Sequence, residues 1–374
     1  MPGSSKVHIF HAETVGSLPH SDELIKARND FDYKAITQEQ LRRIEDEEIR
    51  KAVALQERLG FEAVTDGELR RKTYMDFLTD GISGIRVEWV SQAGVGGYRN
   101  LEGGNTSTPR PVFKVFDRIR HLPSSPGPRD FEFLKAVTKQ VGKATVVGPG
   151  FIHFFGGRDA ISRDVYRDLD GFWSDLIAAY HLELQQLGAA GCTYVQIDET
   201  SLIKLVDPVI RDSLAARGDD PEAVQQKYFE VLMAVVAGAP KGMRLGLHLC
   251  RGNNHGRWQA QGGYDSVAKR LFKQVNVDVF SLEFDSPRAG SFEPLKELPE
   301  GKVAVLGLLS TKVRTAEDAD QIVGRIHEAS KFAPLEFLGV SPQCGFWGGM
   351  NLCSPGETEA KLRRVIEVAK RVWH

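Results

Sequence analysis

The stretch RLGLHLC, residues 244–250, decides the fold class of this 374-residue chain. It is an apolar run of strand length that ends with two chemically active side chains, His248 and Cys250. Side chains two residues apart on a strand point to the same face, so these two groups lie together at the end of a buried strand. Imidazole and thiolate are preferred ligands of zinc, so the pair can bind one metal ion together. Packing of both side chains in a core is the alternative.

Similar apolar runs, bounded by glycine or acidic residues, alternate with amphipathic stretches along the chain. This alternation predicts successive βα units around a parallel sheet. The eight predicted strands begin at His8, Phe61, Lys143, Thr193, Arg244, Val277, Lys302 and Glu336. The clearest predicted helices begin at Thr37, Asp168, Ala316 and Gly356.

Eight such units predict a (β/α)8 TIM barrel, and an open doubly wound sheet is the alternative. The barrel is favoured because polar residues follow so many of the strands, at the rim where barrel enzymes carry their active sites. These residues are Glu68, Asp198, His248, Cys250, Glu283 and Cys344. A glycine-rich segment with aromatic residues, at about 81–118, is too long for a plain loop. We therefore predict one α/β barrel domain over residues 1–374, with a β-hairpin or lid inserted after the second strand.

Composition excludes several classes of partner. The chain is 41% hydrophobic and 26% charged, which allows a large core, and its net charge is −2. No basic block alternates with aromatic residues, so we expect no nucleic-acid partner. The N-terminus lacks the apolar core of a signal peptide, and the most apolar stretch, residues 231–239, is too short to cross a bilayer. We expect a cytoplasmic protein without a membrane partner.

The chain has four cysteines, which are too few in this length to indicate a disulfide framework. Cys192 precedes a predicted strand and is interpreted as a packing residue, whereas Cys353 follows Cys344 in a loop and is a reserve ligand. Glu283 and Cys344 are further candidate ligands beside His248 and Cys250. The two thiolates, the one carboxylate and a Zn²⁺ ion would together carry one negative charge. A substrate thiol that loses its proton and displaces the carboxylate keeps this charge. Zinc stabilises a thiolate whose free pKa is about 8.5, so its sulfur can attack an alkyl carbon near neutral pH.

Six motifs, in order, resemble the C-terminal catalytic barrel of cobalamin-independent methionine synthase. They are TVGSLPHS from Thr14, DGELRR from Asp66, QIDET from Gln196, HLC from His248, SLEF around Glu283 and PQCG around Cys344. The resemblance extends over nearly the whole chain. It implies that zinc is the cofactor and that its ligands are His248, Cys250, Glu283 and Cys344.

The thiol substrate of that family is homocysteine, and the resemblance also implies how it would bind. Its carboxylate would contact the backbone of Gly16 and Ser17, and its ammonium would contact Glu68 and Asp198. Considered alone, Gly16 and Ser17 could form only a tight turn. The two acids could equally be structural and pair with nearby cations, which are Arg70, Arg71 and Lys204.

Two departures from the family concern the alkyl donor. The plant and bacterial synthases carry a second, N-terminal barrel that helps to bind the folate tail, and this chain has no room for one. The family also has a catalytic histidine after its seventh strand, where this chain has Leu309 in LGLLSTK. A leucine cannot donate a proton, and general acids contribute about 10²–10⁴-fold to such reactions. Either another residue, such as His20 or His153 at the rim, supplies the proton, or the donor is different.

The sequence therefore predicts zinc-dependent transfer of a methyl or other alkyl group to a small thiol, with homocysteine giving methionine as the best match. The donor could be a small molecule or a methyl-carrying corrinoid protein. One alternative is attack of a zinc thiolate on an epoxide, as in the epoxyalkane:coenzyme M transferases. Others are a zinc- or thiol-binding homologue without activity, and a metal-free lyase resembling uroporphyrinogen decarboxylase.

Overall fold

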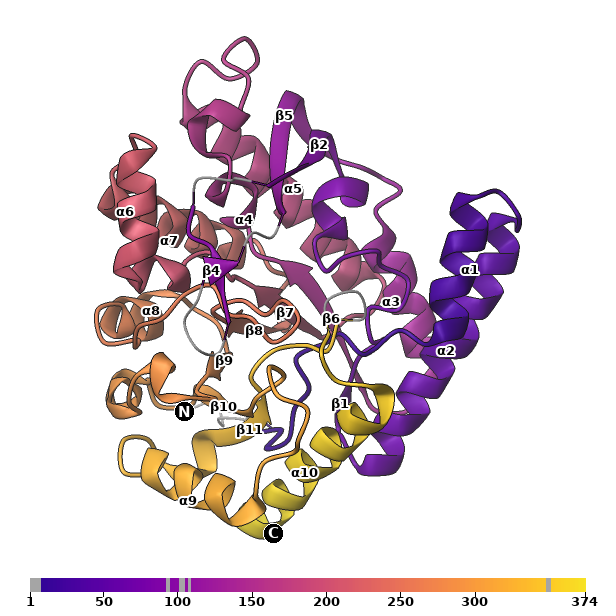
Figure 1. Cartoon of the computed structure of the whole chain (residues 1–374), viewed down its shortest axis with the longest axis vertical. Coiled ribbons are helices and arrows are strands. Elements are labelled where there is room, and N and C mark those ends of the chain that lie inside the picture. The colour runs from indigo at the N-terminus through magenta and orange to yellow at the C-terminus, as the bar shows by residue number, and fades with distance from the viewer. Residues whose placement is uncertain (1–7, 92–94, 101–104, 107–108, 348–350) are drawn as a thin grey trace.

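The computed structural model describes residues 8–91, 95–100, 105–106, 109–347 and 351–374. Its centre is a curled parallel sheet of seven strands in the order β1-β6-β7-β8-β9-β10-β11 (Figure 1). The strands are β1 (Ala63–Val64), β6 (Val141–Val147), β7 (Tyr194–Asp198), β8 (Arg244–Leu249), β9 (Val279–Glu283), β10 (Val303–Leu309) and β11 (Leu338–Pro342). Successive strands of the sheet are neighbours, so the strand order never reverses as it does in a doubly wound sheet. The predicted barrel architecture is confirmed.

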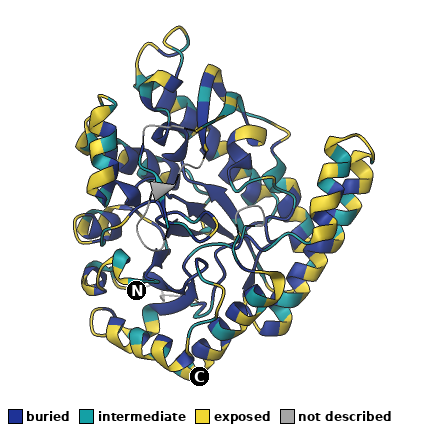
Figure 2. Ribbon diagram, viewed as in Figure 1, coloured by how far each residue is buried: buried dark blue, intermediate teal, exposed yellow. Residues whose placement is uncertain are grey.

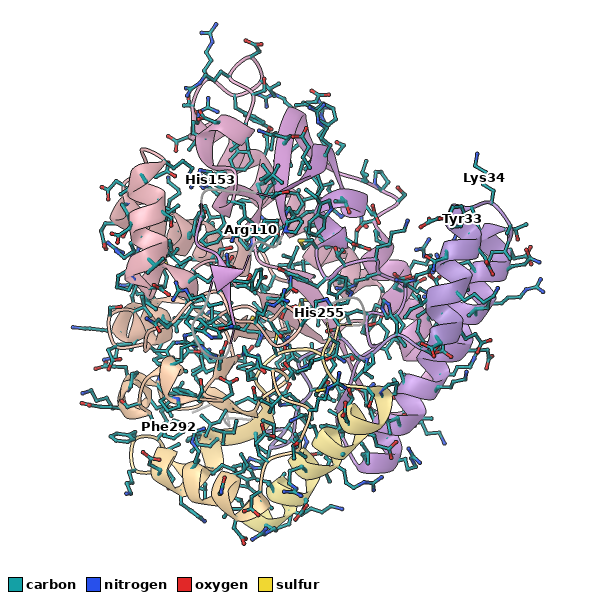
Figure 3. All side chains as sticks on the ribbon, in the orientation of Figure 1. Tyr33, Lys34, Arg110, His153, His255 and Phe292 are labelled. Atoms are coloured by element: carbon teal, nitrogen blue, oxygen red, sulfur yellow. The ribbon has the colours of Figure 1, made fainter. Side chains whose placement is uncertain are left out.

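Helices surround the outside of this sheet, and their outer faces carry most of the exposed residues (Figures 1 and 2). The four clearest predicted helices are present as α2 (Gln38–Leu59), α5 (Leu169–Ala189), α9 (Ala319–Ala329) and α10 (Pro355–Trp373). The others are α1 (Asp22–Asp32), α3 (Pro126–Val137), α4 (Phe151–Phe154), α6 (Pro208–Ala216), α7 (Pro221–Ala237) and α8 (Ala268–Gln274). The turn between α1 and α2, with Tyr33 and Lys34, projects from the body (Figure 3).

The predicted starts of α2, α5 and α10 are correct to within one residue because side chains satisfy the free backbone N–H groups there, whereas α9 begins three residues after the predicted Ala316. Thr37 and Gln40 form a reciprocal capping box at α2, and Ser354 and Glu357 form another at α10. Asp168 accepts hydrogen bonds from two backbone N–H groups at the start of α5.

The first predicted strand, from His8, is wrong as a continuous strand. This segment makes a single parallel bridge, between Ala12 and Val340 of β11. The backbone carbonyl oxygens of Thr14, Val15 and Gly16 accept hydrogen bonds from side chains, so they are not available to a neighbouring strand. The donors are Lys143 to Thr14, Gln196 to Val15, and Thr65 to Gly16. The segment still lies between β11 and the end of β1, where Leu18 N donates to Gly67 O at 3.0 Å.

The predicted hairpin after the second strand is confirmed. β2 (Ile82–Val90) pairs with β5 (Arg110–His121) in antiparallel register, and β3 (Tyr98–Arg99) and β4 (Asn105–Thr106) form a smaller pair between them. A parallel bridge from Val115 to Ile161 connects the hairpin to the body. In the described part of the chain, no helix has the length and apolar character needed to cross a bilayer.

Candidate active site

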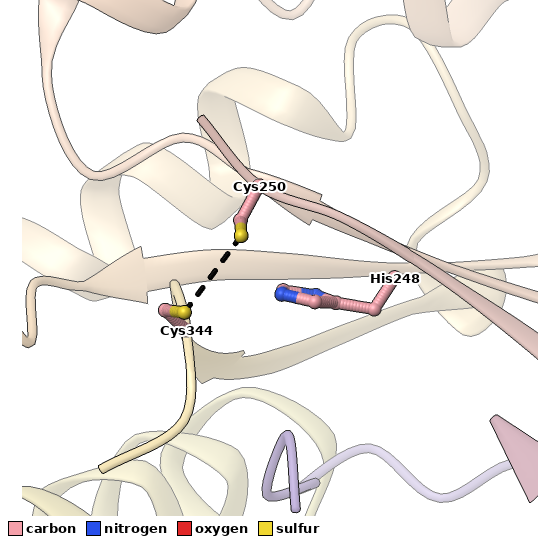
Figure 4. Close-up of side chains that lie close together, drawn as sticks. All are labelled: His248, Cys250 and Cys344. Carbon is pink, nitrogen blue, oxygen red and sulfur yellow. Dashed lines mark hydrogen bonds between the residues drawn. The ribbon is translucent and has the colours of Figure 1, made fainter. Parts of the chain in front are cut away.

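A cluster of one histidine and two cysteines lies at the carboxyl ends of the strands. His248 is in β8, Cys250 directly follows that strand, and Cys344 follows β11 (Figure 4). The potential ligand atoms of these three residues all lie within 4.8 Å of one another. The two sulfur atoms are 3.7 Å apart. Alternation along β8 turns His248 and Cys250 to one face, as predicted, and the sheet register brings β11 close enough to add the third group.

The donor set fits a thiophilic metal ion such as Zn²⁺. Both ring nitrogens of His248 are buried and have no hydrogen-bond partner in the described residues, although buried polar atoms normally have one. The thiol of Cys344 donates to the sulfur of Cys250, and this contact lowers the pKa of Cys250 well below its ordinary value while raising that of Cys344. A thiolate and an unpartnered imidazole beside each other are suitable zinc ligands.

Glu283, the fourth predicted ligand, lies near the cluster but is not brought into it. Its carboxylate accepts hydrogen bonds from Arg251 N at 2.5 Å, from Arg288 Nη2 at 2.5 Å and from Lys312 Nζ at 3.2 Å. Burial would raise the pKa of Glu283, but Lys312 and Arg288 hold it below its ordinary value. The carboxylate is therefore ionised and surrounded by cations, and its role as a ligand stays a prediction.

The four residues predicted to bind homocysteine lie together. Ser17, Glu68 and Asp198 line the same cavity as the cluster. Gly16 lies directly behind them, because a Cβ there would be 2.8 Å from Thr145 Cγ2 and 3.2 Å from Glu68 Oε1. The close approach requires a residue without a side chain.

Glu68 occupies a left-handed backbone conformation, with φ of 57°, directly after Gly67 at 68°. Such a conformation is uncommon for residues other than glycine and is often found where a side chain has a special role. Asp66 supports the turn, because its Oδ1 accepts from Glu68 N at 2.9 Å. Glu68 Oε1 pairs with Thr145 and Arg71, whereas its buried Oε2 has no partner in the described residues.

Burial raises the pKa of both acids. That of Asp198 rises to about 7, although His248 lowers it, and that of Glu68 rises although Arg71 lowers it. Arg71, which pairs with Glu68, is one of the three cations that the sequence offered as structural partners for these acids. Asp198 accepts from Gln196 Nε2 at 2.8 Å, and no ion pair to it is found among the described residues.

The cavity around the cluster has about 950 Å³ of empty space, part of which is open solvent at its mouth. Much of its wall is aromatic or contributed by the hairpin, which the sequence did not predict as site residues. These lining residues are Tyr74, Trp89, Tyr98, Arg110, Phe151, Phe155, Lys204 and Trp347. From the sequence, Trp89 and Tyr98 are identifiable only as aromatic residues of the 81–118 insertion. Arg110 and His153 are labelled in Figure 3.

Neither histidine proposed as a proton donor lines this cavity. His153 is buried on α4, with its Nδ1 3.0 Å from the hydroxyl of Tyr228, and burial lowers its pKa to about 4. Burial also lowers the pKa of His20 to about 4. Leu309, where the family has its histidine, is completely buried at the end of β10 and does not line the cavity either. Cys353 lies outside the cluster, with its sulfur 3.4 Å from Val313 O.

The fold and the site together define an α/β barrel protein with a His/Cys cluster at the carboxyl ends of its strands. The family described as "Cobalamin-independent synthase, Catalytic domain" matches residues 10–98 and 138–371. The chain belongs to this family, whose members are methionine synthase-like methyltransferases.

Individual relatives agree with this assignment. The chain is 34% identical over 369 residues to the uncharacterized protein YxjH of Bacillus subtilis, covering 97% of this chain and 95% of that one. The crystal structure of a putative vitamin-B12 independent methionine synthase from Listeria monocytogenes has a TM-score of 0.76 and 31% identity, with 98% of each chain covered. The 5-methyltetrahydropteroyltriglutamate–homocysteine methyltransferase of Saccharomyces cerevisiae is 23% identical over 379 residues, and this chain spans 43% of its length.

Proposed function

We propose that this protein transfers a methyl group to a small thiol in a zinc-dependent reaction, with homocysteine as the acceptor and methionine as the product. The observation that carries the proposal is the placement of His248, Cys250 and Cys344 within 4.8 Å in a cavity that also contains two buried acids. A thiol that carries an amino-acid ammonium group is complementary to both features.

His248, Cys250 and Cys344 would hold the zinc, with Glu283 as the fourth ligand implied by the family resemblance. When bound, zinc would keep the acceptor sulfur ionised near neutral pH. The carboxylate of Glu283 already pairs with Arg288 and Lys312, so it would keep these partners if a substrate thiolate replaced it as a ligand.

Glu68 and Asp198 would bind the ammonium group of the acceptor. Glu68 Oε2 is a buried acceptor atom without a partner in the described residues, and the carboxyl of Asp198 has a pKa of about 7, which burial raises against the effect of His248. An ammonium group bound between Glu68 and Asp198 would lower the pKa of both carboxyls. It would also donate hydrogen bonds to carboxyl oxygens that are buried away from water. A thiol that carries a sulfonate would be repelled, which favours homocysteine over coenzyme M.

A second candidate is a zinc- or thiol-binding protein without transfer activity. It is motivated by Leu309, which stands where the family has its proton donor and lies outside the cavity. The two candidates agree on the metal site and on thiol binding. They differ only in whether a thioether is formed, and a corrinoid-bound methyl group or an epoxide remains an alternative electrophile.

The first test measures zinc content and homocysteine binding. We expect one zinc per chain in the wild type, and a loss of zinc affinity of more than about 100-fold in both Cys250→Ser and Cys344→Ser. Cys353→Ser is the matched control, since Cys353 is buried and yet outside the cluster, and should keep full zinc. Full zinc occupancy in either cluster variant would refute the ligand set. Zinc and homocysteine binding without a thioether from any donor would favour the second candidate.

A further inference from the structure

Lys204 is a buried cation in the wall of the active-site cavity. It lies in a short 3-10 helix, Ile203–Val206, that follows β7, and only 2% of its surface is exposed. It lines the same cavity as Cys250 and Cys344. In the described part of the chain, its Nζ makes no hydrogen bond and no ion pair. The cavity side is therefore where a partner for this ammonium can bind.

The surroundings of Lys204 are mainly aromatic. Its Nζ lies 5.9 Å, 5.4 Å and 5.9 Å from the ring centroids of Phe151, Phe154 and Phe155. Ring faces attract a cation, but they cannot replace the hydrogen bonds that an ammonium loses on leaving water. Burying such a group without an acceptor is costly, and proteins keep costly groups mostly where they have a function.

The charged and titratable groups around Lys204 are Glu199, Arg110, Cys250 and Cys344. The carboxylate of Glu199 is already used by the backbone, because it accepts from the N–H groups of Gly150, Ser201 and Leu202 at 2.9 to 3.1 Å. Burial lowers the pKa of Lys204 to about 8, although Cys250 and Glu199 raise it. The amine is therefore protonated at neutral pH and gives up its proton more readily than an ordinary lysine, which suits a general acid.

The two tyrosines on the cavity wall, Tyr74 and Tyr98, are poorer acids at neutral pH. Burial raises the pKa of Tyr74 and Tyr98 well above that of an ordinary tyrosine. Both proposed histidines lie outside the wall, and so does Leu309. Glu68 and Asp198 are assigned to the acceptor.

We propose that Lys204 is a catalytic residue that contacts the leaving atom of the alkyl donor and protonates it, a role that rests on the proposed function of the site. The acceptor thiol first loses its proton to solvent. Its sulfur then forms a bond to the alkyl carbon, and the bond from that carbon to the leaving atom breaks. The electron pair stays on the leaving atom, which takes a proton from Lys204. The neutral amine then regains a proton from water, so the sum is thiol plus alkyl donor giving thioether plus protonated leaving group.

This role predicts that the need for Lys204 depends on the basicity of the leaving group. Iodide leaves without a proton, whereas the oxygen of 1,2-epoxypropane and the nitrogen of a 5-methyltetrahydropteroyl donor require one. The experiment uses the zinc-loaded protein with homocysteine and each of these three donors, and measures thioether formation by mass spectrometry. The variants are Lys204→Met and Lys204→Arg, with Lys331→Met, an exposed lysine in the turn after α9, as the control.

We expect Lys204→Met to lose about 10²–10⁴-fold more rate with a basic donor that the wild type accepts than with iodomethane, whose iodide needs no proton. Lys204→Arg keeps the charge but releases its proton too weakly, so it should resemble the methionine variant. In the wild type, the rate with the basic donor should fall at alkaline pH, because Lys204 loses its proton there and burial lowers its pKa from the ordinary lysine value. Equal rates for all donors in Lys204→Met, or equal slowing for all of them, would overturn the role.

The design separates this inference from the proposed function. A wild-type protein that alkylates homocysteine with iodomethane but with neither basic donor overturns the role of Lys204 and leaves thiol activation in place. A wild-type protein that does not accelerate even the iodomethane reaction overturns both. Bound zinc and the iodomethane rate also report whether each variant is folded, so a loss confined to the basic donors cannot result from misfolding.

Discussion

His153 is a residue whose burial determines its chemistry. Burial lowers its pKa to about 4, and Arg217 lowers it further, so the ring is neutral at pH 7. Its Nδ1 lies 3.0 Å from the hydroxyl of Tyr228, and its ring packs against Trp173 with centroids 5.5 Å apart. A neutral histidine that is enclosed in this way and does not line the cavity serves the packing of α4.

We predict that His153→Ala destabilises the fold without impairing the reaction. Loss of a large buried side chain should lower the free energy of unfolding by about 2–4 kcal/mol. The thioether rate per folded molecule should stay within about twofold of the wild type. Urea denaturation measures the first quantity, and an assay with iodomethane and homocysteine measures the second. A fully stable variant with a rate reduced more than tenfold would instead make His153 part of the reaction.

The same residue predicts how stability depends on pH. Its folded pKa is lower than the unfolded value of about 6.5, so the stability from burying the neutral ring is complete above pH 6.5. It is lost progressively as the pH falls from about 6.5 towards 4. Urea denaturation at several pH values should therefore give a steeper decline for the wild type than for His153→Ala in this window. Parallel curves for the two proteins would contradict the assigned pKa.

Single residues of the site were predictable where strand alternation and motif order fix them. His248 and Cys250 share a face because they are two apart on β8, and Cys344 meets them because β11 ends at the same rim. The partners of Glu283 were not predictable, since Arg288 and Lys312 come from loops whose paths depend on packing. The sequence suggests Lys204 only as a partner for Glu68 or Asp198. Sequence spacing does not reveal that the carboxylate of its neighbour Glu199 accepts hydrogen bonds from backbone N–H groups instead.

At the level of elements, the β2–β5 hairpin supplies one side of the cavity. It contributes Trp89 from β2 and Arg110 from β5, and β3 between them contributes Tyr98. Trp89 is 49% exposed although it is a large aromatic side chain. A half-exposed aromatic ring that lines a cavity is available to contact a bound ligand.

We predict that Trp89→Ala weakens the binding of the alkyl donor and not that of the thiol. Loss of an aromatic contact worth about 0.5–1.5 kcal/mol should raise the KM for the donor by about 2- to 12-fold. The affinity for homocysteine, measured by calorimetry, should not change, because the acids and the cluster that we propose to bind it lie on the barrel. Phe116→Ala, an exposed aromatic residue on β5 that does not line the cavity, is the control. Equal effects on both substrates would contradict this division of the site.

Element boundaries were predicted well where capping residues mark them and less well where strands are short. Thr37 and Asp168 mark the starts of two helices in the sequence itself. The strand predicted from Phe61 is reduced to Ala63–Val64, because Gly67 and Glu68 adopt left-handed conformations that end it. Such a turn is supported by the contact of Glu68 with Thr145, which is distant in the sequence.

At the level of the whole molecule, the segment before α1 joins the two edges of the sheet. It bonds to Val340 of β11 on one side and to Thr65 and Gly67, after β1, on the other. Beneath it, Lys143 Nζ lies 2.9 Å from Glu13 Oε2, and both side chains are buried. This ion pair connects the segment to β6, so it stabilises the closed barrel on which every side chain of the site depends.

We therefore predict that Lys143→Met destabilises the whole protein by about 3–5 kcal/mol, because it leaves the carboxylate of Glu13 buried without its cation. Glu13→Gln leaves the ammonium of Lys143 without its anion and should also be costly. The double variant removes both charges, so its loss should be smaller than the sum of the single losses by at least about 1 kcal/mol. Urea denaturation of the four proteins measures this coupling. Additive losses would mean that the ion pair does not act as a unit, and that the hydrogen bonds to Val15 and Gly16 close the barrel without it.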